Sequence, residues 1–414
     1  MSHENLNSAD RRAFLQAGAI AAAGVAAAAG GSELQAQEVK AVEGSVIPKR
    51  KLGKTGVEVT MLDQGAIRGS QTDRVLRAAY AGGIRMFDTA KVYGTEPAFK
   101  KWFEAAPEVR KNIFLITKDM PKTADQIPGM VDERLKTLGT NHIDLFFLHG
   151  LGDDKDVDAV SFIKSKELAK VVDAVKKSGK IKFFGFSSHH KDRAAIISAA
   201  AEGGFVDAIM LQYTPWLDKE TPLNKALDAA WKSKIGLISM KQIAGNFFGD
   251  KPKGNILDDV VKKVPALKER NLSPFQGLLH AIWTDERINA VCVSMRNTDQ
   301  IRENIDAARR YEPLKTVDIR QLRDAALAHG PTLCADCDGR CSMAAGTKAE
   351  LGNLTRFLTY HEHHGLRAEA RREYAALTDE ARDWADADLQ AARDACPSGL
   401  DFASLLPKAV RHLA

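Results

Sequence analysis

Four side chains that could handle a proton together stand close to the ends of three short apolar segments. Asp88, Lys118 and His149 each end such a segment, and Tyr93 lies five residues beyond Asp88. Tyrosine, with an ordinary pKa of about 10, exchanges protons slowly near neutrality. A neighbouring ammonium favours tyrosinate, a carboxylate can hold that ammonium charged and oriented, and a histidine can donate to a carbonyl oxygen. Hydride addition to a carbonyl develops negative charge on oxygen and needs a nearby proton donor, so these residue types suit that reaction.

Each of these residues alone is a weak signal. A single lysine or histidine at the end of a strand is more often part of a structural ion pair or a satisfied core residue. Four compatible groups at the ends of three consecutive segments are much harder to attribute to chance. They indicate an active site, provided that the fold brings the three segment ends together.

The order of secondary-structure elements supplies that condition. The chain alternates short β-branched or aromatic runs with amphipathic helical stretches, such as residues 73–81, 166–178, 223–233 and 274–283. Several runs are almost continuously apolar, as parallel strands covered on both faces should be. The predicted strands are residues 57–67, 84–89, 113–117, 143–148, 181–186, 208–212, 236–240 and 290–294.

Eight such units favour an α/β fold of the (β/α)8 TIM-barrel type over an open doubly wound sheet. No GxGxxG motif follows the first strand, as a dinucleotide-binding open sheet would have. In a closed barrel the active site lies at the carboxyl ends of the strands. Asp88, Lys118 and His149 are therefore predicted to converge on one barrel mouth.

These motifs, taken in order, resemble the aldo/keto reductase superfamily over residues 44–312. The resemblance rests on the segments Phe87-Asp88-Thr89-Ala90, Tyr93-Gly94 with Glu96, Thr117-Lys118, Ile143-Asp144-Leu145 through His149, Gly185-Phe186-Ser187-Ser188, Gln212-Tyr213, Met240-Lys241, and Arg296 through Asn304. It implies a (β/α)8 barrel that reduces a small-molecule carbonyl to an alcohol, or the reverse, with NADP(H).

The resemblance also assigns a role to each matching position. It implies that Tyr93 is the general acid/base, Lys118 its pKa-lowering partner, Asp88 the orienting carboxylate and His149 the carbonyl-orienting group. The implied nucleotide-binding residues are Ser187, Ser188, Gln212, Met240, Arg296, Gln300 and Asn304. A guanidinium fork at Arg296 suits a 2′-phosphate, which favours NADP over NAD.

The chain departs from the family pattern around the cofactor rather than around the catalytic groups. Ser188 stands where the family usually has Asn, and Val293-Ser294 stands where Pro-Gly is usual. The first strand carries Asp63 and Gln64 where a glycine-rich turn is commoner, and these side chains would narrow the pocket. Nucleotide binding is therefore less firmly predicted than proton transfer.

The first 36 residues have the order of an export signal. Arg11 and Arg12 precede an uncharged Ala/Gly-rich run over residues 17–31, and Leu34-Gln35-Ala36 offers a small-residue cleavage site. The paired arginines resemble the twin-arginine class. The run is too short and too rich in alanine for a stable membrane span. We expect the twin-arginine export machinery to deliver a soluble periplasmic or otherwise exported protein; the alternative is a cytosolic N-terminal helix.

Residues 313–414 are predicted to form a helical extension with a cysteine motif. Cys334, Cys337 and Cys341 have the spacing of the start of a ferredoxin-type cluster motif, and Cys396-Pro397 lies far downstream. Three outcomes stay open: an iron–sulfur site completed by Cys396, a zinc site with the same four thiolates, or a relic with free thiols or a disulfide.

Composition excludes other classes of function. The 414 residues carry a net charge of only +5, from scattered Lys and Arg, so a nucleic-acid interface is not expected.

Export conflicts with the use of free NADPH, which is not expected outside the cytoplasm. The nucleotide would then travel locked in the folded protein, or electrons would enter through the cysteine tail. The rival from another class is a non-catalytic exported barrel that binds a ligand or a partner.

Overall fold

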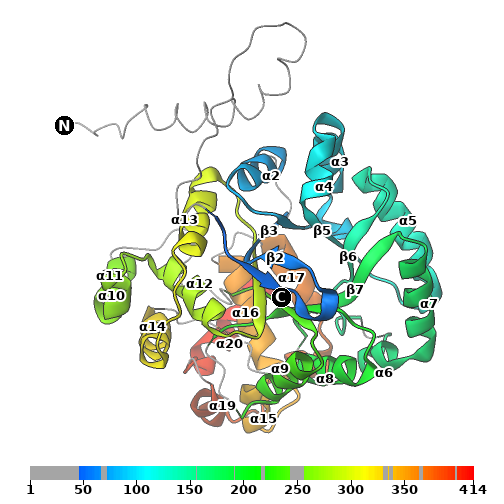
Figure 1. Ribbon diagram of the computed structural model, residues 1–414. Helices are drawn as coiled ribbons and strands as arrows, with labels where there is room; N and C mark the ends of the chain where they lie inside the picture. Colours follow the sequence, from blue (N-terminus) through cyan, green and yellow to red (C-terminus); the bar gives the residue numbers. More distant parts are fainter. Residues whose placement is uncertain are drawn as a thin grey trace, which may run out of the picture. The chain divides into compact units, whose positions relative to one another are not determined.

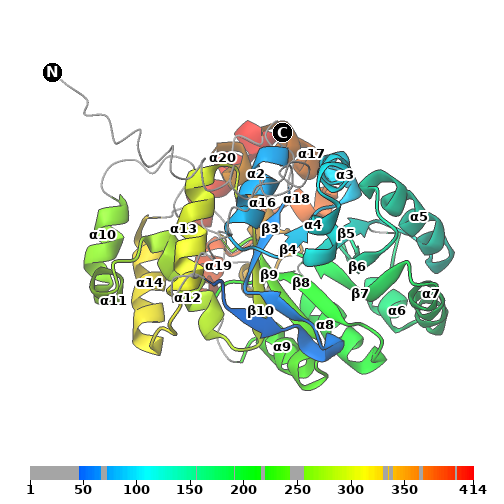
Figure 2. The same ribbon diagram turned by 45° about the horizontal axis from the view of Figure 1, so that its top comes forward.

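A computed structural model describes residues 46–66, 72–154, 156–190, 192–215, 220–242, 256–329, 334, 339–362, 367–396 and 399–414. Eight parallel strands close into a barrel in the order β10-β3-β4-β5-β6-β7-β8-β9, which confirms the predicted (β/α)8 fold (Figures 1 and 2). The strands are β3 (Leu62–Gly65), β4 (Met86–Asp88), β5 (Phe114–Asp119), β6 (Ile143–Leu148), β7 (Ile181–Ser188), β8 (Ala208–Gln212), β9 (Gly236–Met240) and β10 (Ile288–Val293).

A short antiparallel hairpin precedes the barrel and closes its amino-terminal end. Strands β1 (Lys49–Lys51) and β2 (Glu58–Thr60) pair with each other and not with the barrel strands. Leu52 and Val59 reach from this hairpin into the cluster of apolar side chains that fills the barrel. The predicted strand over residues 57–67 is therefore two strands, β2 and β3, because the chain turns at Met61 from the hairpin into the barrel.

The direction in which the catalytic candidates point follows from the alternation of side chains along each strand. Met86, Ile116 and Phe147 belong to the cluster inside the barrel, whereas Phe87, Leu115 and Phe146 belong to the cluster between the barrel and its helices. Successive side chains of a strand point to opposite faces. Two residues beyond each interior residue stand Asp88, Lys118 and His149, so all three point inward at the carboxyl ends.

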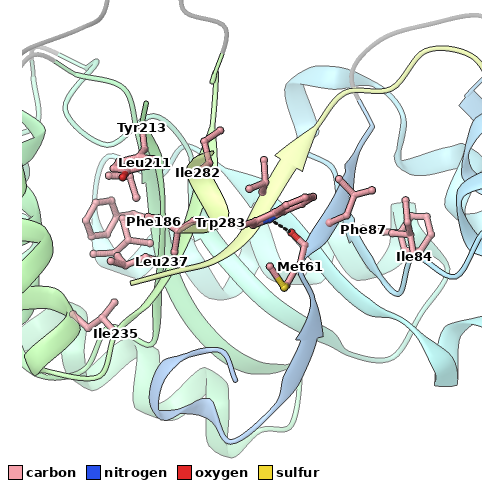
Figure 3. Close-up of a cluster of buried hydrophobic side chains, with 14 of the residues drawn as sticks. Met61, Ile84, Phe87, Phe186, Leu211, Tyr213, Ile235, Leu237, Ile282 and Trp283 are labelled. Atoms are coloured by element: carbon pink, nitrogen blue, oxygen red, sulfur yellow. Dashed lines mark hydrogen bonds between the residues drawn. The ribbon is translucent and has the colours of Figure 1, made fainter. Parts of the chain in front are cut away.

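The helices cover the outside of the barrel. They are α2 (Thr72–Ala81), α3 (Glu96–Ala105), α4 (Pro107–Asn112), α5 (Ile127–Leu138), α6 (Ala159–Lys164), α7 (Lys166–Lys177), α8 (Arg193–Gly203), α9 (Pro222–Lys232), α10 (Ile256–Lys263), α11 (Pro265–Glu269), α12 (Pro274–Thr284) and α13 (Thr298–Arg309). Trp283 of α12 is fully buried, and its indole N–H donates to the carbonyl of Met61 at 3.0 Å (Figure 3). This bond fixes α12 to the point where the chain enters the first barrel strand.

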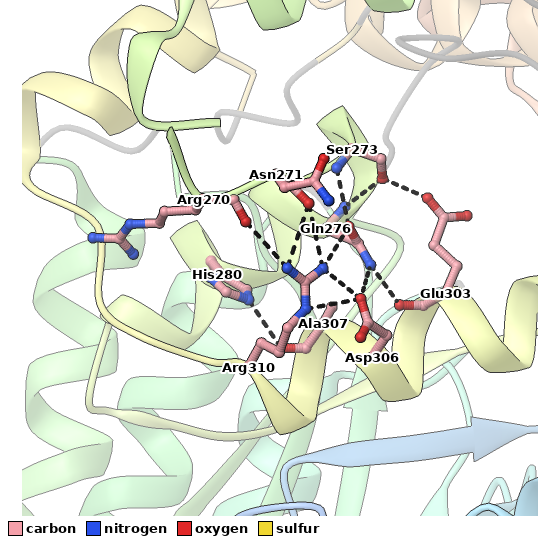
Figure 4. A network of polar contacts seen from close by, with 9 residues as sticks. All are labelled: Arg270, Asn271, Ser273, Gln276, His280, Glu303, Asp306, Ala307 and Arg310. Carbon is pink, nitrogen blue, oxygen red and sulfur yellow. Dashed lines mark hydrogen bonds and ion pairs between the residues drawn. The ribbon is translucent and has the colours of Figure 1, made fainter. Parts of the chain in front are cut away.

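A polar network joins α12 to α13 (Figure 4). The Gln276 amide donates to the Glu303 carbonyl at 3.0 Å and to Asp306 at 2.9 Å, while Arg310 pairs with Asp306. Ser273 caps α12 with a full capping box, and its hydroxyl also contacts Glu303. The network therefore fixes the position of α13, the helix that carries two of the predicted phosphate-binding residues, Gln300 and Asn304.

The carboxyl-terminal helices gather around a second apolar cluster. The tail begins with α14 (Thr316–His329), whose Leu322 and Ala325 instead belong to the cluster between the barrel and its helices. The helices around the second cluster are α15 (Arg340–Ala344), α16 (Leu351–Glu362), α17 (Arg367–Ala376), α18 (Asp379–Arg382), α19 (Leu389–Ala395) and α20 (Phe402–Leu413). Leu354, Leu358, Phe402 and Leu406 lie in that cluster with little or no exposure. Among the described residues, no helix is long and apolar enough to cross a membrane.

Candidate active site

A buried ion pair lies at the centre of the barrel mouth. The Lys118 ammonium donates to both carboxylate oxygens of Asp88 and, at 3.1 Å, to the carbonyl of Thr89. Lys118 is 1% exposed and Asp88 3% exposed. Burial alone would lower the pKa of Lys118, but the Asp88 carboxylate more than offsets it, so the pKa of Lys118 is raised. The lysine is therefore a fixed cation.

Tyr93 stands above this cation on a short 3-10 turn, η2 (Lys91–Tyr93), which ends at Gly94 with φ of 66°. The Lys118 Nζ atom lies 5.4 Å from the centre of the Tyr93 ring. The Tyr93 hydroxyl lies 3.4 Å from Nε2 of His149, and the two rings meet edge to face with centroids 5.4 Å apart. The structure thus brings together the four residues that the sequence singled out.

His149 is a neutral imidazole in this setting. Burial, together with the charges of Lys118 and Lys241, lowers the pKa of His149 to about 3. A histidine with so low a pKa cannot supply a proton at neutral pH, although its remaining N–H can donate a hydrogen bond. The side chain that can transfer a proton at this site is Tyr93.

Buried polar contacts that the sequence analysis did not assign fix the Tyr93 turn. The Thr95 hydroxyl donates to the Ala66 carbonyl at 2.8 Å and lies 2.7 Å from the Thr89 hydroxyl. Glu96 accepts a hydrogen bond from Thr117 at 2.7 Å and pairs with Arg134 at 3.2 Å. The turn is therefore tied on its carboxyl side to β5 and α5. The sequence signal that could have indicated this contact was Glu96, three residues after Tyr93.

A cationic group of side chains borders His149 and was also missed. Nε2 of His189 lies 3.3 Å from the Asp153 carboxylate, but burial together with Lys241, Arg356, His149 and Arg193 lowers the pKa of His189 well below its ordinary value, so this histidine is uncharged. Lys241 has a left-handed backbone, with φ of 52°. Arg356 belongs to α16, so the tail contributes a charge near the barrel mouth.

The amide of Gln212 points to a missing partner in the mouth. Gln212 is 1% exposed, and neither its nitrogen nor its oxygen has a hydrogen-bond partner among the described residues. Buried amides are rarely left so, because an unmade hydrogen bond is costly. The Gln212 side chain has an NH₂ group that donates and a carbonyl oxygen that accepts. The carboxamide of nicotinamide has the same two groups, so each could serve as the other's partner.

A profile of the aldo/keto reductase family matches residues 59–326. The chain belongs to the aldo/keto reductase family. The uncharacterized oxidoreductase YrpG of Bacillus subtilis is 25% identical over 301 residues, which cover 62% of this chain and 89% of that protein. The NADPH-dependent alpha-keto amide reductase of Saccharomyces cerevisiae is 31% identical over 156 residues, or 37% of this chain and 48% of that protein.

The fold agrees with the family. The holo form of the aldo-keto reductase AKR11C1 from Bacillus halodurans superposes with a TM-score of 0.55 at 20% identity, covering 67% of this chain and 96% of that chain. The protein is thus an oxidoreductase with a (β/α)8 barrel, and NADP(H) is the usual cofactor of aldo/keto reductases. Family membership and the assembled catalytic group argue against the non-catalytic barrel that the sequence analysis kept as a rival.

Among the other residues predicted to bind the nucleotide, two serines already make hydrogen bonds within the protein. The Ser187 hydroxyl accepts from the Gly150 amide at 3.1 Å, and the Ser188 hydroxyl donates to the Leu151 carbonyl at 2.8 Å. Both serines are buried and connect β7 to the loop after β6. Met240 ends β9 and is partly buried. Gln212 is therefore the clearest candidate for direct contact with the nicotinamide.

The residues predicted to bind the phosphate end of the nucleotide lie just before α13 and within it. Arg296 and Gln300 are exposed, and the Gln300 side chain accepts from the Arg296 amide at 2.7 Å. Asn304 is 9% exposed, one turn further along the helix. Gln64 donates to the Met295 carbonyl at 3.3 Å and so supports the turn that lacks the usual Pro-Gly. Asp63 and Gln64 are both buried inside the structure, and that these side chains narrow the pocket stays a prediction.

The described cysteines of the tail lie in or against one apolar cluster, although they come from two separate segments of the sequence. Cys334 and Cys341 are buried in the second apolar cluster and Cys396 packs against it. Burial, together with Cys334 and Cys396, raises the pKa of Cys341 to about 12, so the three lie within electrostatic reach. A cavity of about 350 Å³ beside Cys334 and Cys341 is also lined by Arg356 and by Asp192 of the barrel. Cys337 lies outside the described residues.

The described cysteines form no disulfide with one another. Nor do the described residues contain three or more histidine, cysteine or carboxylate side chains spaced to hold one metal ion. The Arg356 guanidinium lies 3.9 Å from the Cys334 sulfur, which gives that thiol a cationic neighbour. The predicted signal peptide, residues 1–36, lies outside the described residues as well.

Proposed function

We propose that the protein is an NADP(H)-dependent carbonyl reductase in which Tyr93 delivers the proton. The observation that carries this proposal is the assembly of Tyr93, His149 and the Lys118–Asp88 pair at one barrel mouth. A bound nicotinamide supplies hydride to the carbonyl carbon of a small aldehyde or ketone. The chain's own residues then manage the charge that develops on the carbonyl oxygen.

Tyr93 and His149 divide that task. Their polar atoms are 3.4 Å apart, close enough for one carbonyl oxygen to accept from both. Because His149 is neutral, it orients the oxygen by a hydrogen bond, while Tyr93 gives up its hydroxyl proton. The Lys118 ammonium below the ring stabilises the tyrosinate that remains, and Asp88 keeps the ammonium in place. In the direction of alcohol oxidation the same tyrosinate accepts the proton.

The nucleotide would be held at two ends of the mouth. Gln212 has an unused amide for the nicotinamide carboxamide, with Ser187, Ser188 and Met240 beside it in the barrel. Arg296, Gln300 and Asn304 follow β10 at the other end, where a guanidinium suits a 2′-phosphate and favours NADP over NAD.

Binding and turnover test the proposal together. The purified protein is titrated with NADPH by calorimetry and then mixed with a panel of aldehydes and ketones, while loss of nicotinamide absorbance is followed. We expect binding by both the wild type and Tyr93→Phe, and aldehyde-dependent oxidation of NADPH by the wild type alone. A folded protein that shows no affinity for NADPH contradicts the proposal.

We also propose that residues 1–36 are a twin-arginine signal and that the protein works in the periplasm. The support is Arg11-Arg12 before an Ala/Gly-rich run and a small-residue cleavage site. A folded protein can carry its nucleotide through this pathway, which would reconcile export with a need for NADP. Fractionation of cells that express the wild type and an Arg11→Lys, Arg12→Lys variant tests this. Retention of the wild type in the cytoplasm contradicts it.

For the tail, residues 313–414, we propose a four-thiolate site for an iron–sulfur cluster. The support is the motif spacing of Cys334, Cys337 and Cys341 in the sequence, with Cys396 packed against the same apolar cluster as Cys334 and Cys341; the described thiols are not spaced for a metal ion as they stand, so binding would have to draw them together. Iron, sulfide and zinc are measured in anaerobically purified wild type and in Cys334→Ser. Iron with sulfide that is lost in the variant supports the cluster. Zinc alone, or a metal-free protein, contradicts it.

A further inference from the structure

Asp63 lies inside the barrel next to the catalytic ion pair. On β3 its register partners are Cys292 of β10 and Met86 of β4, two residues before Asp88. Asp63 has no exposed surface at all. The charged or titratable groups that interact with it are Asp88, Lys118 and Cys292. A second carboxyl group is thus enclosed with a single ammonium.

No N–H or O–H donor of the described residues serves this carboxyl. Neither of its oxygens has a conventional hydrogen-bond partner there, and its one hydrogen-bonding neighbour is the Cys292 thiol, a weak donor. The Lys118 ammonium has three donors, and they are directed to the two oxygens of Asp88 and to the Thr89 carbonyl. Lys118 therefore compensates Asp88 and has no proton left for Asp63.

A buried carboxyl without a partner keeps its proton rather than its charge. Burial raises the pKa of Asp63 well above its ordinary value, and the nearby Asp88 raises it further; the Cys292 thiol and Lys118 oppose the shift without cancelling it. Burial likewise raises the pKa of the Cys292 thiol, so this neighbour stays uncharged too. The pair Asp88–Lys118 then sits in a neutral surrounding.

We propose that Asp63 is a neutral carboxylic acid in the working enzyme and a positioning residue for proton transfer, because it leaves Lys118 with one carboxylate partner only. This role rests on the proposed function. Ionisation of Asp63 would place a second negative charge beside Lys118. The ammonium would then favour tyrosinate less, so Tyr93 would hold its proton more tightly and less tyrosinate would be available as the base for alcohol oxidation.

The proton on Asp63 can be observed directly in the resting protein. Infrared difference spectra between wild type and Asp63→Asn, taken at pH 7 without nucleotide or substrate, should show a protonated-carboxyl carbonyl band that the variant lacks. Asp285→Asn is the matched control: Asp285 is also enclosed, but hydrogen bonds from Arg287 and Tyr213 hold its pKa below the ordinary value despite its burial, so the band persists. An unchanged band in Asp63→Asn overturns the proposal.

Unfolding equilibria give a second readout. The unfolded chain loses the Asp63 proton above about pH 4 whereas the folded chain keeps it, so this group favours folding less and less as pH rises. Asp63→Asn removes that trend. We expect the ratio of the variant's folding constant to that of the wild type to rise with pH above 4, by up to about tenfold per unit. A ratio constant with pH, as a purely structural role would give, overturns the proposal.

Two variants of Cys292 keep the test open if Asp63→Asn does not fold. A serine hydroxyl is a stronger donor than a thiol and favours the carboxylate, so Cys292→Ser should lower the pH at which the infrared band disappears. Cys292→Ala removes the donor and should raise it. Equal midpoints in the two variants overturn the assignment. None of these measurements requires turnover, so they separate failure of this proposal from failure of the reductase proposal.

The catalytic consequence is tested by the pH profile of alcohol oxidation. The rate of alcohol oxidation by Asp63→Asn should match that of the wild type within about twofold near neutrality, where the side chain at position 63 is uncharged in both proteins. At alkaline pH the rate of the variant should exceed that of the wild type. Profiles that stay parallel over the whole range overturn the coupling to Tyr93.

Discussion

The Tyr93 hydroxyl and the His149 Nε2 atom lie 3.4 Å apart, with the two rings edge to face. This arrangement sets two potential donors at one point of the barrel mouth. Burial, with Lys118 and Lys241, lowers the pKa of His149 to about 3, so only the tyrosine can transfer its proton near neutrality. The cation that assists Tyr93 lies 5.4 Å from the ring centre.

Tyr93→Phe should remove the proton donor and leave the pocket filled. We expect the rate of carbonyl reduction to fall by about 10²–10⁴-fold, the usual size of general acid–base catalysis. The NADPH dissociation constant should change by less than about threefold, because no proposed nucleotide contact is lost. Single-turnover kinetics and calorimetry measure the two quantities. A variant with a wild-type rate would show that Tyr93 is not the donor.

His149 should not titrate in the physiological range. Its pKa of about 3 predicts that carbonyl reduction shows no inflection from this group between pH 5 and 8. The unfolded chain binds a proton on His149 below about pH 6.5 while the folded chain does not, so stability should fall as pH drops from 6.5 towards 3. His149→Gln should flatten that dependence in urea titrations. If NMR spectra of the folded protein show the His149 imidazole titrating near pH 6.5, this prediction is ruled out.

The Lys118–Asp88 pair should behave as a unit. Lys118→Met leaves the Asp88 carboxylate buried without its partner and should lower the free energy of unfolding by about 3–5 kcal/mol. Adding Asp88→Asn removes that charge and should restore much of the loss. Neither variant should reduce carbonyls, since Tyr93 has lost its cation. Additive stability losses in the double variant would contradict the coupling.

Gln212→Leu should affect binding and stability in opposite directions. The substitution removes two buried polar atoms that lack partners, so the nucleotide-free protein should gain about 1 kcal/mol of stability. Affinity for NADPH should fall by roughly tenfold or more, because the carboxamide contacts are gone. Thermal unfolding with and without NADPH measures both effects. Equal affinity in wild type and variant would place the nicotinamide elsewhere.

Arg296→Ala should change the preference between the two nucleotides. Loss of the guanidinium should weaken NADPH by about tenfold and leave NADH nearly unaffected, since only NADPH carries the 2′-phosphate. Arg302→Ala is the matched control, because Arg302 lies six residues further along the chain, on α13, and pairs with Asp299 at 3.4 Å. Parallel losses for both nucleotides would move the phosphate site away from Arg296.

Most of the barrel could be predicted from sequence because its strands are apolar and short. The predicted strands over residues 143–148, 208–212 and 236–240 match β6, β8 and β9 at both ends. The hairpin of β1 and β2 was not predicted as such. Its second strand, β2, runs in sequence almost directly into β3, and only the turn at Met61, whose carbonyl accepts from the Trp283 indole, separates them.

Three of the candidate catalytic residues, Asp88, Lys118 and His149, could be predicted because they stand at inward positions at the carboxyl ends of strands. The supporting residues could not, because their partners are distant in sequence: Glu96 with Arg134, and His189 with Arg356. Asp63 was noticed as a departure, but it was expected to narrow the pocket. Its position below the ion pair depends on the register of β10 against β3, which periodicity alone does not give.

Deuterium transfer tests the reductase account most directly. The purified protein is mixed with NADPH deuterated at C4 of the nicotinamide and with an aldehyde that the initial panel shows to be reduced, and the alcohol is analysed by mass spectrometry. We predict one deuterium on the carbinol carbon for the wild type and a rate at least about 100-fold lower for Tyr93→Phe. Alcohol formed without deuterium, or formed equally fast by Tyr93→Phe, would contradict hydride transfer from the nucleotide with Tyr93 as proton donor.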